Sequence, residues 1–235
     1  MKIQTKLLED FINKIQMNTI ETCLLNFTEA GLVIKTAALD ASCMCDGLLE
    51  ASAFTDYVAL GEVGVDNLST LKKTFKRFGT ELVFEIEGNS FTVNKGGKKE
   101  LSFELVSPQF IEIPKDFPKL THSTSFNIKS SQWHEFFKDI RDSEIKDAVI
   151  IITSVDNGVI LENTGKYKFK HNIESEGTIS GEKASFGQPL IDALTPFVCG
   201  NIICNLKTDY PLSVIYTAEH MKISVLIAPR VNKGE

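Results

Sequence analysis

A cluster of four cations stands out in an otherwise acidic chain, within the stretch 67–79, NLSTLKKTFKRFG. The cations are Lys72, Lys73, Lys76 and Arg77. Without them the formal charge of −6 would be −10. At 100° per residue they fall on one side of a helix, opposite an apolar stripe. The stripe consists of Leu68, Leu71, Phe75 and Phe78. Such a helix can present its charge to an anionic partner, although a solvated outer face is the simpler alternative.

No catalytic or metal-binding arrangement accompanies this cluster. The four histidines are scattered, and none has the spacing of an HExxH motif. The stretch 94–99, NKGGKK, lacks the GxxxxGK[ST] spacing of a phosphate loop, and neither GxSxG nor GxGxxG occurs. The sequence therefore favours a protein that is not an enzyme, with no catalytic residue, cofactor or metal. An enzyme on an unrelated two-domain α+β fold remains a remote alternative.

The composition is that of an ordinary globular protein. A chain of 235 residues, 43% of them apolar, can form one large domain or two of about 115 residues each. No apolar run approaches the roughly 18 residues that span a membrane, and the N-terminus has no signal-peptide core. The five cysteines lie in apolar surroundings, are odd in number and lack zinc-site spacing. We therefore expect free thiols and an intracellular location.

The order of predicted elements occurs twice. Each half is predicted as strand, helix, four strands, helix and three strands, with helices over 6–17, 67–78, 130–141 and 189–198. An offset of 125 takes Phe11 to Phe136, and an offset of 122 takes Phe75 to Phe197. A half of this kind has two helices on one side of an antiparallel sheet, which is an α+β fold.

A proline-rich stretch separates the halves. Three prolines in 107–120, SPQFIEIPKDFPKL, exclude a helix or a central strand. We therefore predict an N-terminal domain over 1–107, an extended connector over 108–120 and a C-terminal domain over 121–235.

The C-terminal stretch carries the most specific signal. The segments DYPLSVIY, 209–216, and VLIAPRV, 225–231, resemble the C-terminus of sliding clamps of the proliferating-cell nuclear antigen type. The segment ALDAS, 38–42, is similar to the one that follows the first hairpin in that family. The resemblance covers essentially the whole chain, and either an archaeal or a virus-encoded clamp fits it.

The resemblance implies a homotrimeric ring that encircles double-stranded DNA. Such a ring tethers DNA polymerase and other client proteins and is served by a clamp loader, in the cytoplasm or nucleoid of a cell or in a virus-infected host. Helices line the hole, so the implied DNA-binding residues lie on their outward faces. Besides the four cations of the cluster, these are Lys14, Lys138 and Arg141. Because 189–198 contains no cation, most of the positive charge would lie on 67–78.

The resemblance also implies a pocket for the apolar motif of client proteins. The matching positions are Leu39, Cys43, Met44, Ile111, Ile113, Pro211, Leu226, Ile227, Ala228, Pro229, Arg230 and Val231. Without the resemblance, ordinary core packing is the favoured interpretation of the apolar members.

The implied subunit contact joins two strand edges. One is the strand 99–104, with Glu100, Phe103 and Glu104. The other is a strand over 166–170, with Lys166, Lys168 and Lys170. Opposite charges across an antiparallel pair favour association, although lysines can also protect a free edge against aggregation. A subunit of a heteromeric ring, of the checkpoint or heterotrimeric kind, is the closest alternative to a homotrimer.

Overall fold

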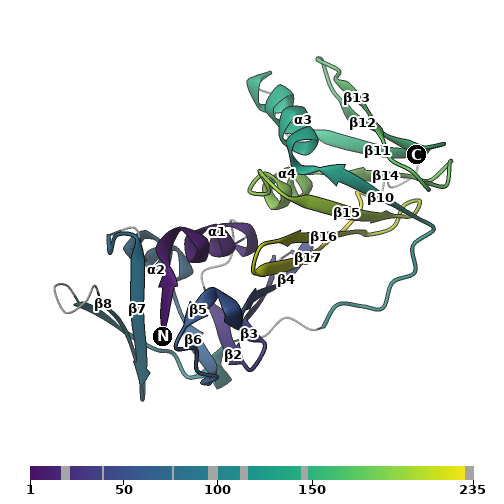
Figure 1. The fold of residues 1–235 in the computed structure, drawn as a ribbon. Helices are drawn as coiled ribbons and strands as arrows, with labels where there is room; N and C mark the ends of the chain where they lie inside the picture. Colours follow the sequence, from purple (N-terminus) through teal and green to yellow (C-terminus); the bar gives the residue numbers. More distant parts are fainter. Residues whose placement is uncertain are drawn as a thin grey trace. The chain divides into compact units, whose positions relative to one another are not determined.

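The computed structural model describes residues 1–16, 22–38, 40–75, 77–94, 100–111, 116–143 and 148–230. Four expected site residues, Leu39, Lys76, Ile113 and Val231, lie outside these ranges. The chain divides into two compact units (Figure 1). Unit 1 comprises Met1–Ala37, Cys45–Lys115 and Glu219–Ile223, and unit 2 comprises Ala38–Met44, Asp116–Ala218 and Ser224–Glu235. The domain limits and connector expected from the sequence stay predictions.

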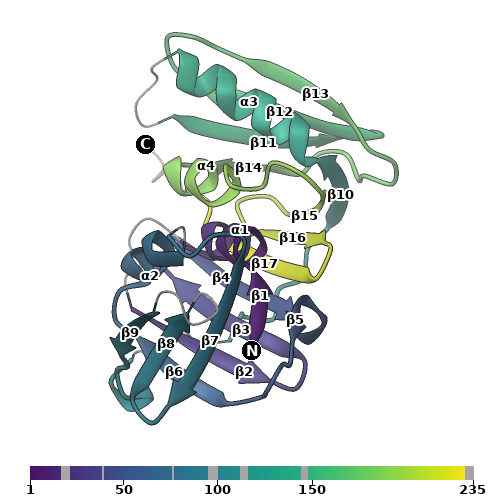
Figure 2. The ribbon, with the colours of Figure 1, turned by 60° about the vertical axis from the view of Figure 1, so that its left-hand side comes forward.

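Unit 1 combines two helices with antiparallel strands. One sheet has the order β5-β1-β7-β8-β9, and a second set has the order β4-β3-β2-β6. The helices are α1 (Thr5–Ile15) and α2 (Leu68–Phe75). The strands are β1 (Lys2–Gln4), β2 (Cys23–Thr28), β3 (Gly31–Ala37), β4 (Cys43–Glu50), β5 (Phe54–Thr55), β6 (Gly61–Val65), β7 (Glu81–Glu87), β8 (Ser90–Asn94) and β9 (Glu100–Glu104). Short 3₁₀ turns, η1 (Ala51–Ala53) and η2 (Pro108–Phe110), follow β4 and β9. Figure 2 shows α1 and α2 beside each other.

Unit 2 has the same plan. One sheet has the order β13-β12-β11-β14, and a second set has the order β10-β15-β16-β17. The helices are α3 (Ser130–Asp142) and α4 (Gln188–Leu194). The strands are β10 (Thr124–Lys129), β11 (Val149–Val155), β12 (Gly158–Thr164), β13 (Lys170–Glu174), β14 (Lys183–Phe186), β15 (Asn201–Leu206), β16 (Leu212–Ala218) and β17 (Met221–Ile227). The predicted order of elements is confirmed, with the two-residue β5 as an addition in the first half.

The apolar stripes of the sequence form the core. In α2, Leu68, Leu71 and Phe75 are buried, and so is Phe78 in the turn that follows. In α3, the buried stripe consists of Trp133, Phe136, Phe137 and Ile140. Burying an aliphatic or aromatic side chain stabilises the fold by about 1.5–3 kcal/mol, so each stripe fixes which face of its helix remains outside.

One side-chain cap and two backbone features set the ends of α2. The Asn67 side-chain oxygen accepts a hydrogen bond from the Thr70 N–H at 2.7 Å and so caps the start of the helix. The helix ends at Phe75, before the predicted 78, because the Arg77 N–H turns back to the Thr74 carbonyl at 2.8 Å. Gly79 then adopts a φ of 91°, a left-handed conformation that glycine takes without strain.

The predicted strand over 166–170 is wrong, because β13 begins only at Lys170. The buried side chain of Asn163 holds the preceding segment in a turn. Its amide nitrogen donates to the Tyr167 carbonyl at 2.9 Å, and its oxygen accepts from the Phe169 N–H at 2.6 Å. Lys166 and Lys168 therefore lie in the turn between β12 and β13.

The fold class is α+β, as predicted. Within the described ranges, none of the helices has the length and apolar character needed to cross a membrane.

Candidate nucleic-acid and partner surfaces

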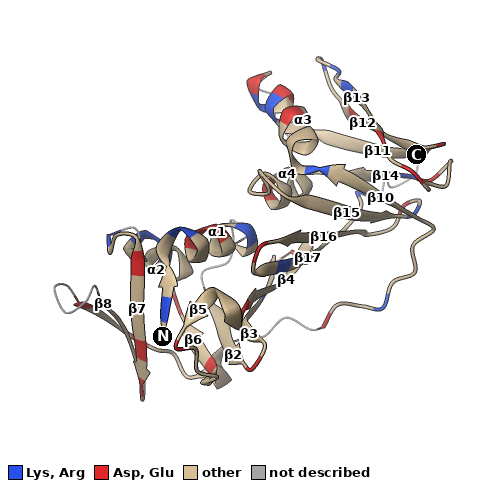
Figure 3. Ribbon diagram, in the orientation of Figure 1, with Lys and Arg blue, Asp and Glu red and all other residues tan. Residues whose placement is uncertain are grey.

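The described cations of the cluster are accessible in different degrees. Lys73 and Arg77 are exposed, whereas Lys72 is half-buried. Figure 3 shows this positive charge on α2. Lys73 makes no hydrogen bond or ion pair to any residue that the structure describes, so its ammonium group is open to an outside ligand.

Lys72 takes part in a hydrogen-bond network between the two helices of unit 1. Its ammonium group donates to the Gln16 side-chain oxygen at 3.0 Å. The amide nitrogen of the same Gln16 donates to the Ser69 hydroxyl at 2.6 Å. Gln16 immediately follows α1, where its own N–H caps the Ile12 carbonyl at 2.8 Å. One glutamine thus joins the end of α1 to α2 and holds the Lys72 ammonium at the junction.

The expectation that Lys14 faces outward is wrong. The residue is only 3% exposed, and its ammonium group forms an ion pair with Asp10, one turn earlier on α1. The helical pattern allowed either orientation, because Lys14 lies between two apolar positions and borders the stripe of Phe11 and Ile15. Lys6 is the exposed cation of α1.

The helices of unit 2 carry no net positive charge, because carboxylates outnumber cations on each of them. Lys138 and Arg141 are exposed on α3, but the same helix exposes Glu135 and Asp142. Asp139 contributes a further carboxylate, which contacts His171 Nε2 of β13 at 2.9 Å. The sequence of α4, QPLIDAL, contains an acid and no cation.

A tight turn before β4 lies against the C-terminal segment of unit 2. The Asp40 carboxylate accepts from the Ser42 hydroxyl at 2.6 Å and the Ser42 N–H at 3.0 Å. These bonds lower the pKa of Asp40, and both stabilise the ionised form. The Ser42 carbonyl accepts a hydrogen bond from the Ala228 N–H at 2.8 Å. The Arg230 N–H donates to the Ser185 carbonyl at 2.6 Å.

The expected client-binding residues separate into accessible and buried groups. Ala228 and Arg230 are exposed, and Met44, Pro211 and Pro229 are half-buried. By contrast, Cys43, Leu226 and Ile227 are buried, so their side chains pack in the core. Burial also raises the pKa of Cys43 to about 12.

Ile111 also departs from the expectation of an accessible connector residue. It is 8% exposed and packs over Gly64 of β6. A Cβ atom at Gly64 would lie 2.7 Å from Ile111 Cδ1 and 2.2 Å from the Val106 carbonyl oxygen. The glycine lets this segment lie directly on β6, and Ile111 belongs to the core of unit 1. Phe110, next to it, is 77% exposed.

β9 and β13 are terminal strands of their sheets within the part of the chain that the structure describes. β9 pairs with β8, and Glu100 and Glu104 are exposed on it. β13 pairs with β12, where Lys170 contacts Glu162 at 3.3 Å. Lys170 is therefore already partnered within the chain, whereas Lys166 and Lys168 are exposed in the turn.

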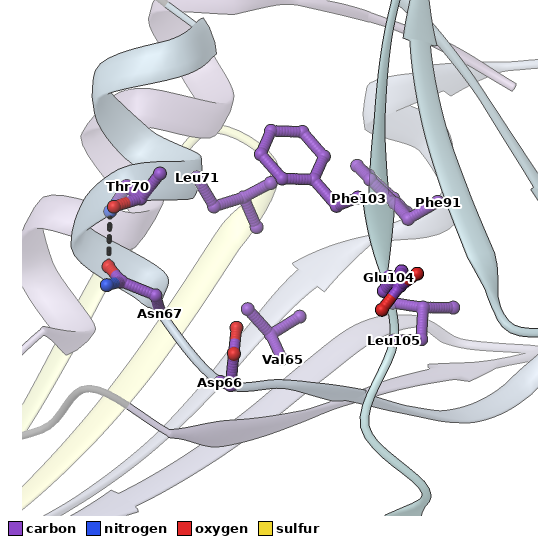
Figure 4. Close-up of a pocket in the computed structure, with 9 residues that line it drawn as sticks. All are labelled: Val65, Asp66, Asn67, Thr70, Leu71, Phe91, Phe103, Glu104 and Leu105. Atoms are coloured by element: carbon purple, nitrogen blue, oxygen red, sulfur yellow. Dashed lines mark hydrogen bonds between the residues drawn. The ribbon is translucent and has the colours of Figure 1, made fainter.

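A pocket opens beside the end of β9 (Figure 4). It holds about 360 Å³ of space between its walls, part of it open to solvent. Its apolar walls come from Val65, Leu71, Phe91, Phe103 and Leu105, and its polar residues are Asp66, Asn67, Thr70 and Glu104. Figure 4 shows Phe103 close to Leu71 of α2. The pocket thus combines an apolar interior with two carboxylates.

One cysteine contradicts the expectation of apolar surroundings. Cys199, in the turn after α4, is exposed, whereas Cys23, Cys43, Cys45 and Cys204 are buried. Burial raises the pKa of Cys23 to about 12, and it also raises the pKa of Cys204. No group of three or more His, Cys, Asp or Glu side chains in the described ranges is arranged to hold a metal ion.

Gln16, Asn163 and Tyr167 were not singled out by the sequence. The contacts of Gln16 and Asn163 depend on how turns place neighbouring elements, which periodicity does not report. The one available signal for Tyr167 is its own sequence context, an aromatic residue between two lysines in KYK.

The repeated plan of two helices and antiparallel strands is the fold of a DNA clamp. No protein-family model matches the sequence, and no curated protein matches it. Among solved structures, the chain resembles the proliferating cellular nuclear antigen, PCNA, of A. fulgidus bound to the C-terminal region of FEN-1. That match has a TM-score of 0.84 and 19% identity, and it covers 99% of this chain and 98% of the other.

Two further PCNA structures also match nearly the whole chain. PCNA from Entamoeba histolytica has a TM-score of 0.82 and 19% identity, covering 98% of each chain. A chain of the PCNA2-PCNA3 complex from Sulfolobus tokodaii has a TM-score of 0.80 and 19% identity, covering 97% of this chain and 98% of the other. The chain therefore has the PCNA fold over its whole length.

Proposed function

We propose that this protein is a DNA sliding clamp: a ring-forming, non-enzymatic protein that encircles duplex DNA and tethers DNA polymerase and other replication or repair proteins to it. The observation that carries the proposal is the match of the whole chain, in both directions, to PCNA structures. Replication and repair place such a protein with the DNA of a cell or of an infecting virus.

The distribution of charge supports a DNA-facing helix surface. An acidic chain exposes Lys73 and Arg77 on and just after α2 and fixes Lys72 beside them. A protein that slides needs contacts to phosphates, which are the same at every base pair, and not to base edges. Lysine and arginine on a helix face meet that requirement.

The two exposed strand edges support self-assembly. β9 carries acidic residues, and the turn before β13 carries Lys166 and Lys168. An antiparallel pair between these edges of neighbouring subunits gives a head-to-tail contact, which forms a ring if the rotation closes. We propose a homotrimer with this contact.

Light scattering coupled to size-exclusion chromatography tests the ring. We expect a particle with three times the chain mass of 26.1 kDa and, by negative-stain microscopy, a ring with a central hole. A protein that stays monomeric at micromolar concentrations contradicts the homotrimer.

The DNA-facing surface is tested with two matched lysines. Lys73 and Lys138 are both exposed on helices, but the sequence of α2, LSTLKKTF, contains no acid, whereas α3 contains Glu135, Asp139 and Asp142. We expect Lys73→Gln to reduce the slope of log affinity against log salt by about 0.9, the value for one phosphate contact. Lys138→Gln should reduce it less. Equal salt slopes for the wild type and Lys73→Gln would show that α2 is not part of the DNA-binding surface.

The client surface is proposed at the accessible residues of unit 2. The A. fulgidus PCNA structure contains the C-terminal region of FEN-1, so a short peptide is the kind of ligand to test. Met44, Pro211 and Pro229 offer apolar contacts, and Arg230 can hold an acidic group. We expect Pro229→Ser with Met44→Ser to weaken binding of a PCNA-client peptide at least tenfold without changing the oligomer, as calorimetry can measure.

A heteromeric ring is the second candidate. One matched structure is a complex of two different chains, PCNA2 and PCNA3 of Sulfolobus tokodaii. In that case the purified protein stays monomeric and forms a ring only when sister subunits are co-expressed with it.

A further inference from the structure

We infer that Tyr167 is the anchor of the subunit contact, and that it inserts into the pocket beside β9 of the next copy of this chain. The inference rests on the proposed ring and adds a particular side chain, a particular pocket and a direction of insertion to it.

The pocket has the character of a socket for an aromatic side chain. Its walls are apolar, from Val65, Leu71, Phe91 and Phe103, and it lies at a strand end that no other described strand covers. An apolar hollow beside a free strand edge is unfavourable in water, and covering it with an apolar side chain is favourable. Phe103 is only half-buried in the single chain, so a neighbour can complete its packing.

Tyr167 has the exposure and the rigidity of an anchor. It is 51% exposed, in the turn that leads into β13. Asn163 accepts from Phe169 and donates to the Tyr167 carbonyl, so the backbone of the turn is fixed on both sides of residue 168. The Lys166 ammonium lies 5.5 Å from the centre of the Tyr167 ring. A side chain presented on an ordered turn loses little conformational entropy on binding.

Strand direction brings the two features together. In an antiparallel pair, the beginning of β13 lies opposite the end of β9. Tyr167 precedes the first residue of β13, and the pocket contains the last two residues of β9, Phe103 and Glu104. The two strands also turn comparable faces toward their helices, because Phe103 approaches α2 and His171 contacts α3.

Charge complementarity identifies the occupant as a second copy. Tyr167 lies between two exposed cations, Lys166 and Lys168. The pocket has two carboxylates among its lining residues, Asp66 and Glu104. An aromatic residue flanked by cations therefore meets an apolar hollow flanked by acids. Aromatic residues in such central positions often contribute most of the binding energy of an interface.

The first test is alanine substitution with a matched control. Phe110 is another exposed aromatic residue, outside both the pocket and the turn before β13. We expect Tyr167→Ala to raise the dissociation constant of the wild-type oligomer by about 30-fold or more, as for an interface hot spot, and Phe110→Ala to change it less than about threefold. Thermal unfolding at a concentration where all variants are monomeric checks that each one folds.

The second test mixes two defective variants. Phe103→Ala damages only the pocket, and Tyr167→Ala damages only the anchor. In a head-to-tail contact, the intact Tyr167 of the first variant meets the intact pocket of the second, so an equimolar mixture forms dimers that neither variant forms alone. Sedimentation of the mixture measures this gain.

The outcomes separate this inference from the proposed function. A wild-type ring with unchanged assembly in Tyr167→Ala, or a mixture with no added dimer, overturns the anchor and leaves the clamp proposal intact. A wild-type protein that never self-associates contradicts the homotrimeric ring itself, and the anchor falls with it.

Discussion

Gln16 shows how a neutral side chain can organise a charged surface. It accepts a hydrogen bond from Lys72 and donates one to Ser69, so the Lys72 side chain is fixed before any ligand arrives. Fixing a long side chain costs about 0.5–1.5 kcal/mol when it happens during binding. In the proposed clamp, Gln16 is therefore a positioning residue for a phosphate contact.

Two substitutions of Gln16 distinguish the effect of positioning the Lys72 side chain from the effect of its charge. Gln16→Leu removes the acceptor but leaves the charge of Lys72, so we expect DNA affinity to fall about two- to tenfold with an unchanged salt slope. Gln16→Glu keeps an acceptor and neutralises the lysine, so the slope should fall by about 0.9. Fluorescence anisotropy with duplex DNA at several low salt concentrations measures both. Identical slopes in all three proteins would reduce Gln16 to a purely structural link between the helices.

Cys199 gives a second prediction for a single residue. It is the one exposed thiol among the described residues, and burial disfavours the reactive thiolate of Cys23, Cys43 and Cys204. We expect a thiol reagent to modify one group per native chain within minutes, and five after unfolding in guanidinium chloride. Cys199→Ser should abolish the rapid reaction. Rapid modification of a second thiol in that variant would show that a buried cysteine is accessible.

At the level of elements, periodicity predicted what is buried better than what is exposed. The stripe of α2 and that of α3 are both buried as predicted, because burial repeats with the helical period. Lys14 differs from the prediction because a long side chain at the border of a stripe can lie on either side of it, and the ion pair with Asp10 holds this one in its buried position. The turn before β13 differs from the predicted strand because KYKFKHNI alternates apolar and polar residues, whereas the side-chain hydrogen bonds of Asn163 to Tyr167 and Phe169 leave no such pattern.

The contact between Glu182 and Thr208 in unit 2 should make the free energy of unfolding depend on pH. The Thr208 hydroxyl and N–H donate to the Glu182 carboxylate at 2.6 and 2.5 Å, and these bonds, the hydroxyl first, lower the pKa of Glu182 below its ordinary 4.5. A lowered pKa means that the unfolded chain binds the proton more readily. The stabilisation is therefore complete above pH 4.5 and is lost as the pH falls through the folded-state pKa.

Glu182→Gln tests this link. Because the carboxylate is exposed, the effect should be below about 1 kcal/mol, or at most about 4 °C in melting temperature at pH 7. The difference from wild type should shrink as the pH is lowered below 4.5. Calorimetric melts between pH 3 and 7 measure it, and a difference that stays constant over this range would exclude the carboxylate as its source.

For the whole molecule, the sequence was sufficient for the fold because duplication and a few short segments constrain it together. The offsets that relate the halves and the C-terminal VLIAPRV predicted a clamp, and the match to PCNA structures at 19% identity confirms that fold. The site was less accessible to sequence reasoning. Resemblance transfers positions, but it does not report which of them are exposed, as the buried Ile111, Leu226 and Ile227 show.

The proposed assembly predicts that the melting temperature of the protein depends on its concentration. A ring that forms only from folded subunits stabilises them by mass action, so a tenfold increase in concentration should raise the melting temperature by about 2–3 °C. Glu104→Lys places like charges at the proposed contact and should remove that dependence. A concentration-independent melt of the wild type would show that subunits unfold without dissociating, or that no ring exists.

If the protein is the proposed sliding clamp, the uneven charge of its four helices has a consequence for motion along DNA. In the proposed trimeric clamp, the three copies of α2 would present cationic surfaces to the duplex, and the copies of α3 and α4 would present acidic ones. Each contact to a phosphate must be broken whenever the protein moves by one base pair. Fewer contacts therefore give a lower energy barrier to each step. The duplex would contact one cationic surface at a time, which lowers the energy barrier to sliding. The closed ring, and not electrostatic attraction, would keep the protein on the DNA.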